Sequence, residues 1–363
     1  MPLPLVSTLI DTFNQERYIE QAILSVLEQG LSTSELEVIV VDDGSRDGTG
    51  AIVQRFLPRV RYIRKENGGQ ASAFNLAIPE AHGQIVSFLD GDDWWVRGKL
   101  RAVLDAMETA EEVAAVGHGY FEVTGTGEVN EMVVPERTLK LDLLTPEAAR
   151  FADNGRTLLG TSRLSVRRNI LSRILPIPEV LTFCADTPIF TLALALGGAV
   201  VLDDPLCYYR LHGDNLFSSD TQDKSRLRKL LEVYGFLLNY LPEQLIKFGV
   251  PEEAITALLK SDRIELERCR IHFEGNGRWR ALLTELQRFL WTYENPSPGY
   301  VVFKTGVALL ALLLPPRFFY RLMAWYGQKD LKRIRAVLGR AQPRVPIEFV
   351  QRRPAVGRRS VAR

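Results

Sequence analysis

Cysteine is scarce in this sequence of 363 residues. Cys184, Cys207 and Cys269 are far apart and odd in number, so they provide neither a disulfide framework nor the spacing of a zinc site. The chain also runs from Met1 into the apolar stretch Leu5–Ile10 without a basic segment or a cleavage site. We therefore expect no signal peptide and a protein that works in the reducing cytoplasm.

A strong excess of one charge is also absent, although the charges are unevenly distributed. The net charge at pH 7 is +1. Residues 301–363 contain 14 Lys and Arg against only Asp330 and Glu348, which gives them a net charge of +12 and leaves −11 on residues 1–300. The acidic body argues against a nucleic-acid partner, whereas the basic end favours an anionic surface.

No apolar run is long enough to span a bilayer, which takes about 20 residues. Val301–Leu314 is mostly apolar but has 14 residues and ends at two prolines. The aromatic residues of Phe318–Tyr326 are then interleaved with Arg317 and Arg321. We interpret residues 301–363 as a peripheral segment that binds anionic lipid on the inner face of the membrane. The alternative is an amphipathic helix packed on the main domain, followed by a disordered basic tail.

The first third of the chain alternates apolar runs with amphipathic stretches. The expected strands are Val6–Ile10, Val38–Val41, Val60–Ile63 and Ile85–Leu89. The expected helices are Tyr18–Glu28, Ala51–Leu57 and Ala71–Ile78. Strands of continuous Val, Ile and Leu between helices predict an α/β fold with a parallel sheet buried on both faces. After about Ala114 the segments look extended and antiparallel, and residues 223–291 look helical.

Polar residues follow three of the expected strands, at Asp11–Asn14, Asp42–Ser45 and Asp90–Asp93. Ligands of parallel sheets bind beyond the carboxyl ends of the strands. The glycine pattern G-x-G-x-x-G does not follow the first strand, which disfavours a dinucleotide-binding oxidoreductase. These three segments are therefore the candidate site.

Three carboxylates crowd the segment Ser87–Trp94, at Asp90, Asp92 and Asp93. Without a cation they would repel one another, and at least one pKa would rise. Mg²⁺ or Mn²⁺ resolves this repulsion, because hard cations take carboxylate oxygens and share their other positions with phosphates. The alternative is an acidic loop that caps a helix beginning near Val96.

The segment Glu37–Thr49 places an acidic pair at a strand end, before a glycine turn and a helix. A carboxylate here can accept hydrogen bonds from a pyrimidine base or from ribose hydroxyls. Simple turn chemistry, with Asp47 capping the next helix, explains the same pattern.

Four segments in order resemble the successive motifs of family 2 glycosyltransferases. They are Val6–Asn14, Val41–Thr49, Asn67–Gly69 with Ala73–Asn75, and Phe88–Trp94. The resemblance covers roughly residues 5–215. It implies an inverting glycosyltransferase with a GT-A (Rossmann-like) core, a nucleotide-diphosphate sugar donor, and a glycan or lipid-linked acceptor in cell-surface polysaccharide synthesis. The implied division is a nucleotide-sugar-binding half at 1–115, an acceptor-binding half at 116–218, a helical extension at 219–300, and the basic end at 301–363.

The resemblance also implies roles for individual residues. Donor-binding residues are Asp11, Thr12, Asp43, Asn67, Gly69 and Asp92. Residues for Mg²⁺ or Mn²⁺ are Asp90, Asp92, Asp93 and His212. Two positions depart from the family: Asp11 stands where proline is usual, and Phe74 where arginine is frequent. Arg210 is a candidate phosphate-binding residue, and a structural donor is the alternative role for His212.

Asp186 precedes the apolar stretch Ile189–Leu196. The resemblance implies that it is the general base, although Ala185 replaces the glutamate that often precedes it. The alternative is a helix cap, because Pro188 suits a first helical turn. A processive synthase is disfavoured, since Gly275 stands in the glutamine slot of the Gln-x-x-Arg-Trp motif. The remaining rival is an inactive sugar-nucleotide-binding or scaffold protein of the same fold.

Overall fold

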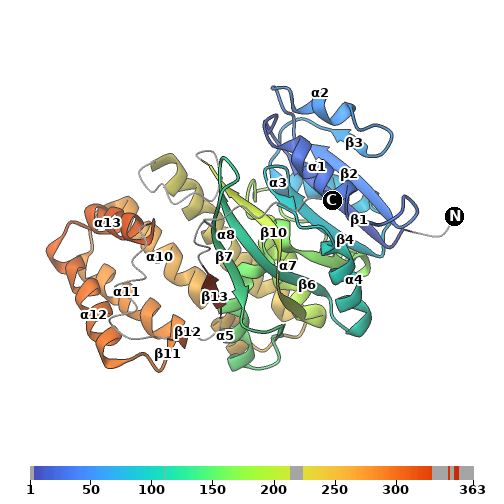
Figure 1. Ribbon diagram of the computed structural model, residues 1–363. Coiled ribbons are helices and arrows are strands. Elements are labelled where there is room, and N and C mark those ends of the chain that lie inside the picture. The colour runs from blue at the N-terminus through green and yellow to red at the C-terminus, as the bar shows by residue number, and fades with distance from the viewer. Residues whose placement is uncertain (1–3, 111, 213–223, 329–341, 344–346, 351–363) are drawn as a thin grey trace, which may run out of the picture.

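A computed structural model describes residues 4–110, 112–212, 224–328, 342–343 and 347–350. Its centre is a large mixed sheet (Figure 1). The first four strands of the chain are neighbours in this sheet, although their order in space differs from their order in the sequence. These strands are β1 (Val6–Thr12), β2 (Leu36–Asp42), β3 (Arg61–Arg64) and β4 (Ile85–Asp90). They run parallel in the order β4-β1-β2-β3, which confirms the predicted parallel sheet.

Helices cover both faces of this parallel part. They are α1 (Ile19–Leu27), α2 (Thr49–Gln54), α3 (Gln70–Ala77) and α4 (Lys99–Thr109). Alternate strand residues enter two separate cores: Leu9 and Phe88 pack with Phe74 on one face, whereas Ile10 and Leu89 pack with other side chains on the other. The continuous apolar runs are therefore explained by burial on both sides.

The second half of the sheet combines both strand directions. Its strands are β5 (Trp94–Trp95), β6 (Ala115–Thr124), β7 (Val129–Pro135), β8 (Leu139–Leu141), β9 (Ser165–Arg167) and β10 (Ala199–Leu211). The pair β6–β7 is antiparallel as expected, but β6 and the long strand β10 are parallel. A parallel pair requires a long crossover, and residues 125–198 provide it.

The crossover and the chain after β10 are mainly helical. Within the crossover are α5 (Pro146–Gly155), α6 (Arg168–Ile174) and α7 (Asp186–Gly197), with short 3-10 turns η2 (Arg156–Leu159) and η3 (Thr161–Arg163). After it come α8 (Lys224–Lys247), α9 (Glu252–Leu258), α10 (Lys260–Glu274) and α11 (Arg278–Thr292). The predicted helical segment at 223–291 is thus confirmed over its described part.

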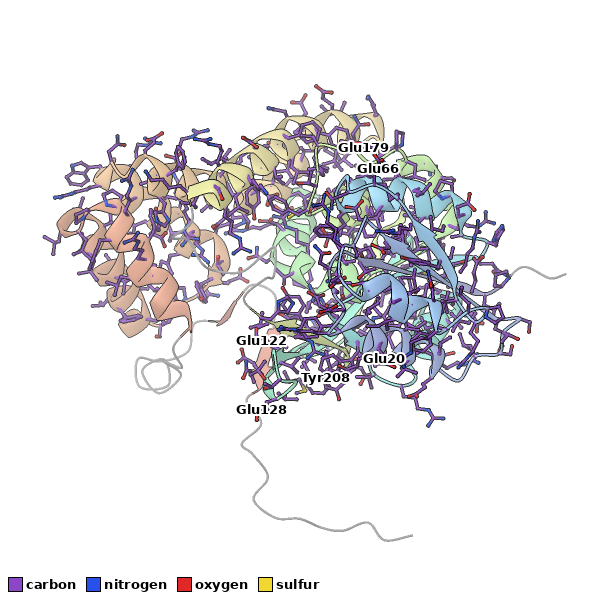
Figure 2. The ribbon with its side chains drawn as sticks, turned by 90° about the horizontal axis from the view of Figure 1, so that it is seen from above. Glu20, Glu66, Glu122, Glu128, Glu179 and Tyr208 are labelled. Carbon is purple, nitrogen blue, oxygen red and sulfur yellow. The ribbon has the colours of Figure 1, made fainter. Side chains whose placement is uncertain are left out.

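The C-terminal segment forms two further helices, α12 (Pro298–Leu313) and α13 (Pro316–Gln328), separated by the prolines. Figures 1 and 2 show α10–α13 gathered to one side of the sheet-containing body. Of the expected basic tail, residues 329–341, 344–346 and 351–363 lie outside the described residues. Residues 347–350 form β13 (Ile347–Val350), which pairs with β7. Within the described ranges, no helix is both long and apolar enough to cross a membrane.

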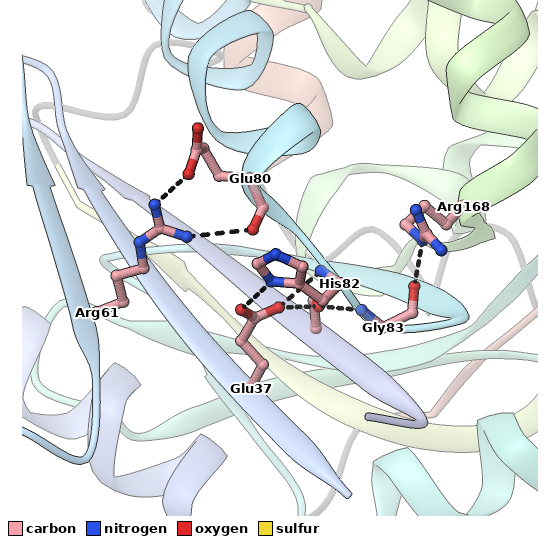
Figure 3. Close-up of polar contacts among 7 residues, drawn as sticks. Glu37, Arg61, Glu80, His82, Gly83 and Arg168 are labelled. Atoms are coloured by element: carbon pink, nitrogen blue, oxygen red, sulfur yellow. Dashed lines mark hydrogen bonds and ion pairs between the residues drawn. The ribbon is translucent and has the colours of Figure 1, made fainter. Parts of the chain in front are cut away.

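The amino-terminal edge of the parallel strands is fixed by a polar cluster (Figure 3). The carboxylate of Glu37 accepts hydrogen bonds from Ser7 Oγ, 2.5 Å away, and from the backbone N–H of His82, 2.8 Å away. Arg61 pairs with Glu80 in the same region. This cluster lies at the opposite end of the strands from Asp11, Asp42 and Asp90, so it stabilises the sheet at a distance from the candidate site.

Candidate active site

The candidate site begins where β1 and β4 end side by side. Asp11 on β1 stands in register with Asp90 on β4, and the carbonyl oxygen of Asp11 accepts from the N–H of Gly91 at 2.9 Å. One side-chain amide serves both acids: Gln70 Nε2 lies 3.4 Å from Asp11 Oδ2 and 3.2 Å from Asp90 Oδ1. Gln70 is the first residue of α3. The parallel sheet therefore brings the first and fourth motifs together.

Asp11, Asp90, Asp92 and Asp93 form an acidic cluster, in which the charge of each carboxylate disfavours ionisation of its neighbours. Burial, and then the charge of Asp92, raises the pKa of Asp11 to about 7. Burial and the neighbouring Asp11 raise the pKa of Asp90 well above its ordinary value. Burial and Asp92 raise the pKa of Asp93 to about 8. A bound cation would reverse these shifts, because it favours the ionised carboxylates.

Asp92 and His212 face each other across the end of this cluster. His212 Nε2 lies 2.9 Å from Asp92 Oδ2, and the two side chains are 11% and 13% exposed. The imidazole is stacked on the ring of Tyr18, with the ring centres 5.1 Å apart. Two residues 120 positions apart in the chain are thus held as one polar pair that solvent can still reach.

Asp93, in contrast, is tied into the protein. Its carboxylate accepts from Ser162 Oγ at 2.5 Å and from the backbone N–H of Arg210 at 2.8 Å. The guanidinium of Arg210 donates to the carbonyl oxygens of Asp92 and Gly125 and to Gln21 Oε1. Arg210, the expected phosphate-binding residue, thus uses these N–H groups to hold the loop of Asp92 and Asp93 against β10.

The donor set can be tested for its fit to a divalent cation. Among the described residues, no three His, Cys, Asp or Glu side chains form a ready metal-binding group. The pair Asp92 and His212 offers one carboxylate oxygen and one imidazole nitrogen within 2.9 Å of each other. A cation that keeps several waters and takes diphosphate oxygens needs only one or two protein ligands. The residues fit a cation bound together with its nucleotide.

The second motif forms a separate part of the site. Asp43 accepts from the backbone N–H groups of Gly68 and Gly69, at 2.9 and 2.7 Å, and pairs with Lys65 at 2.7 Å. Gly69 has φ +86, and a Cβ there would lie 2.5 Å from Thr182 Cα. Only glycine fits this turn without strain. The third motif is therefore folded directly onto the second.

The remaining donor-binding candidates lie around these two groups. Thr12 ends β1, and its hydroxyl donates to Gln15 Oε1 at 2.8 Å. Asn67 is exposed, and its backbone packs closely against Gly44. A Cβ atom added to Gly44 would lie only 2.8 Å from the backbone nitrogen of Asn67. Gly44 has φ +84, which a glycine adopts readily. Thr12 and Asn67 thus lie at or just beyond the carboxyl ends of the parallel strands β1 and β3.

Asp186 lies at the start of α7 but does not cap it. The N-cap residue is Ala185, without a side-chain cap. One oxygen of Asp186 accepts instead from the N–H of Thr161 at 3.0 Å and from its hydroxyl at 3.2 Å. Burial raises the pKa of Asp186, and these two hydrogen bonds oppose that effect. The carboxylate is thus oriented mainly by Thr161 of η3, with a further backbone hydrogen bond from Thr187.

Sequence reasoning missed the residues that join these parts. Besides binding Asp11 and Asp90, Gln70 accepts from the N–H of Ala185 at 3.1 Å, next to Asp186. Ser162 and Thr161 hold Asp93 and Asp186 from a single turn. The position of Gln70 between the two parts of the third motif, Asn67–Gly69 and Ala73–Asn75, was the available signal for it. Nothing in the sequence marked η3.

Comparisons with known proteins identify the family that the chain resembles. The sequence model described as Glycosyl transferase family 2 matches residues 7–173. The uncharacterized glycosyltransferase alr2836 of Nostoc sp. is 32% identical over 256 residues, 67% of this chain and 76% of that protein. EpsJ of Bacillus subtilis, an uncharacterized glycosyltransferase, is 30% identical over 59% of this chain and 63% of its own length.

A further relative and one solved structure complete the comparison. TuaG of Bacillus subtilis, a glycosyltransferase named for teichuronic acid biosynthesis, is 39% identical over 34% of this chain and half of its own length. The crystal structure of S. aureus TarS 1–349 with UDP-GlcNAc superposes with a TM-score of 0.53 at 19% identity, covering 85% of this chain and 91% of that one. At this identity the likeness shows the shared GT-A fold.

Proposed function

Because the chain belongs to glycosyltransferase family 2, we propose that it transfers a sugar from a nucleoside-diphosphate donor to a hydroxyl group with inversion at the anomeric carbon. The observation that carries this proposal is the placement of Asp186. This partly buried, oriented carboxylate is linked through Thr161 and Gln70 to Asp90 of the acidic cluster. An inverting transfer needs this separation of a base from the group that binds the leaving diphosphate.

The donor would lie along the carboxyl ends of β1, β2 and β4. Asp43, which Gly68 and Gly69 hold in place through their backbone N–H groups, is the residue that we assign to the base and ribose. Asp92 and His212 would hold Mg²⁺ or Mn²⁺ at the diphosphate. When bound, the cation supplies Lewis-acid stabilisation of the departing nucleoside diphosphate.

Displacement at the anomeric carbon requires proton removal from the attacking group. The acceptor oxygen forms a bond to the anomeric carbon as the bond from that carbon to the diphosphate oxygen breaks. The acceptor proton passes to Asp186, whose other contacts, to Thr161, fix its orientation. The raised pKa of this partly buried carboxylate makes it a stronger base than a fully exposed aspartate.

A nucleotide-sugar screen tests this function. We expect one class among UDP-, GDP- and dTDP-sugars to raise the melting temperature with Mn²⁺ present, and the same class to be hydrolysed slowly when no acceptor is added. Binding without any hydrolysis or transfer would instead support the inactive binding protein. TarS was crystallised with UDP-GlcNAc, so UDP-sugars are the first group to test.

We further propose that the enzyme works on cell-surface polysaccharide at an anionic membrane, which it contacts through α12 and α13. One face of α12 packs through Tyr300, Ala308 and Ala311. The opposite face leaves Val302 and Leu313 each 73% exposed, with Leu309 between them. From Pro298 to Gln328 the sequence has three cations and no Asp or Glu. Exposed apolar side chains on a segment with a net positive charge suit an interface with anionic lipid.

Liposome co-sedimentation tests this contact. The double variant Val302→Asp with Leu309→Asp should lower binding to phosphatidylglycerol vesicles by about tenfold or more, because burying each apolar side chain contributes about 1.5–3 kcal/mol. Leu144→Asp, at a residue 79% exposed in another part of the molecule, should bind as the wild type does. Wild-type protein that ignores these vesicles at low salt would contradict the contact.

A further inference from the structure

Arg163 is the last residue of η3, the turn whose first two residues hold Asp186 and Asp93. The turn packs against β4, β6 and β10. The guanidinium of Arg163 lies over the rings of Tyr120 on β6 and Tyr209 on β10, 4.5 and 5.3 Å from their centres. Two aromatic rings thus support a cation beside the proposed general base.

The hydrogen-bonding groups of this cation have no protein acceptor in the described part of the chain. Its Nε is buried without a partner. No carboxylate of the described residues lies within 4.0 Å of the guanidinium. The Gly160 backbone leaves room for it, since a Cβ there would lie 2.3 Å from one terminal nitrogen. A half-buried guanidinium normally has a hydrogen-bonded anion as its partner, because an unpaired buried charge is costly.

The nearest negative charges act on Arg163 only through space. Burial raises the pKa of Asp93 and of Asp186, and the positive charge of Arg163 opposes this effect in both. Both acids already accept hydrogen bonds from other residues of η3. Asp93 and Asp186 therefore compensate the charge of Arg163 without accepting its hydrogen bonds. The N–H groups of its planar guanidinium can still bind two oxygens of a ligand.

On the basis of the proposed function, we infer that Arg163 binds an oxyanion, a carboxylate or a phosphate, carried by the sugar substrates beside Asp186. Guanidinium groups bind both oxyanions through paired, charge-assisted hydrogen bonds. The rings of Tyr120 and Tyr209 would fix the orientation of the guanidinium through cation–π contacts. The oxyanion belongs either to the acceptor or to the transferred sugar. A uronic acid and a sugar or polyol phosphate are the substrate classes that this site selects.

The test compares charged probes with neutral ones. Methyl β-glucuronide and methyl β-glucoside form one pair, and glycerol 3-phosphate and glycerol form another. Each is titrated by NMR into wild type, Arg163→Gln and Arg163→Lys, with Mn²⁺ and the nucleoside diphosphate that stabilises the protein most. A second arm compares UDP-glucuronic acid with UDP-glucose in the absence of those probes. Arg59→Gln is the control variant, because it removes one positive charge from an exposed position away from the proposed site.

In wild type, at least one charged probe should bind about tenfold or more tightly than its neutral counterpart, as expected for a hydrogen bond to a charged group. Arg163→Gln should remove that preference and leave the neutral probe and the nucleoside diphosphate within about twofold, whereas Arg59→Gln should change nothing. A preference in the first arm assigns the oxyanion to the acceptor, and one in the second arm to the donor sugar.

Two results would overturn the inference. One is a wild type with no preference for charge in either arm. The other is a preference that survives Arg163→Gln, in a variant whose melting temperature and nucleotide affinity show that it is folded. If Arg163 only compensates the nearby acids, the substitution lowers affinity for charged and neutral probes alike. Failure of the wild type to bind any nucleoside diphosphate with Mn²⁺ would instead contradict the proposed function.

Discussion

Asp186→Asn is expected to lower the rate of sugar transfer by a factor on the order of 10²–10⁴, the usual contribution of a general base. The amide keeps the shape of the carboxylate and can still accept from Thr161, but it cannot take the acceptor proton. Donor affinity should change by less than about twofold, because Asp186 contacts η3 and not the strand ends where Asp43 lies. Single-turnover transfer and calorimetry with the nucleotide measure the two quantities separately.

A matched control separates catalysis from helix stability. Glu147 lies in the first turn of α5, as Asp186 does in α7, so Glu147→Gln also removes a negative charge from a helix start. This control should melt slightly earlier and transfer at the normal rate. If Asp186→Asn behaves in the same way, its carboxylate has only a structural role.

The pH dependence gives a second measure of the same residue. Burial raises the pKa of Asp186 above its ordinary value of 3.8. A base must be ionised to act, so the transfer rate should fall as the pH drops through this raised pKa. The sign for stability is opposite to that of a salt-bridged acid. Folding disfavours the charged form of Asp186. Its contribution to stability is therefore fully present below the unfolded-state pKa and is lost as the pH rises from there through the raised folded-state pKa.

The parallel core was predictable because its signal is local. Val38–Val41 and Ile85–Leu89 are continuous apolar runs of strand length, and both form strands that extend one or two residues beyond the predicted bounds. The acidic segments follow those strands directly, so the parallel arrangement alone places Asp90 beside Asp11. No further information was needed to locate this end of the site.

The contacts that complete the site were not predictable, because they join distant segments through single polar atoms. Gln70 reaches the N–H of Ala185, 115 positions away, and Ser162 reaches Asp93 across 69 positions. Neither residue lies in a periodic pattern. The parallel pairing of β6 with β10 was missed for a related reason: alternation in a strand indicates its buried face but not the direction of its neighbour.

Removal of the divalent cation is expected to lower the affinity for the nucleoside diphosphate by about 100-fold or more, because a metal ion at a diphosphate supplies several kcal/mol of charge stabilisation. The physical reason lies in the acidic cluster. Asp11, Asp90 and Asp93 all have a raised pKa because of burial and mutual repulsion. An uncompensated diphosphate would add negative charge at the same place. Calorimetry with and without EDTA measures the difference.

Substitutions should locate the cation within the cluster. His212→Ala and Asp92→Asn should each weaken Mn²⁺-dependent nucleotide binding, because these side chains face each other at 2.9 Å and remain partly exposed. Asp93→Asn should act mainly on stability, since both oxygens of Asp93 already accept from Ser162 and Arg210. Asp105→Asn, at an exposed position on α4, should behave as the wild type. Unchanged nucleotide affinity in EDTA would show that binding does not depend on a cation.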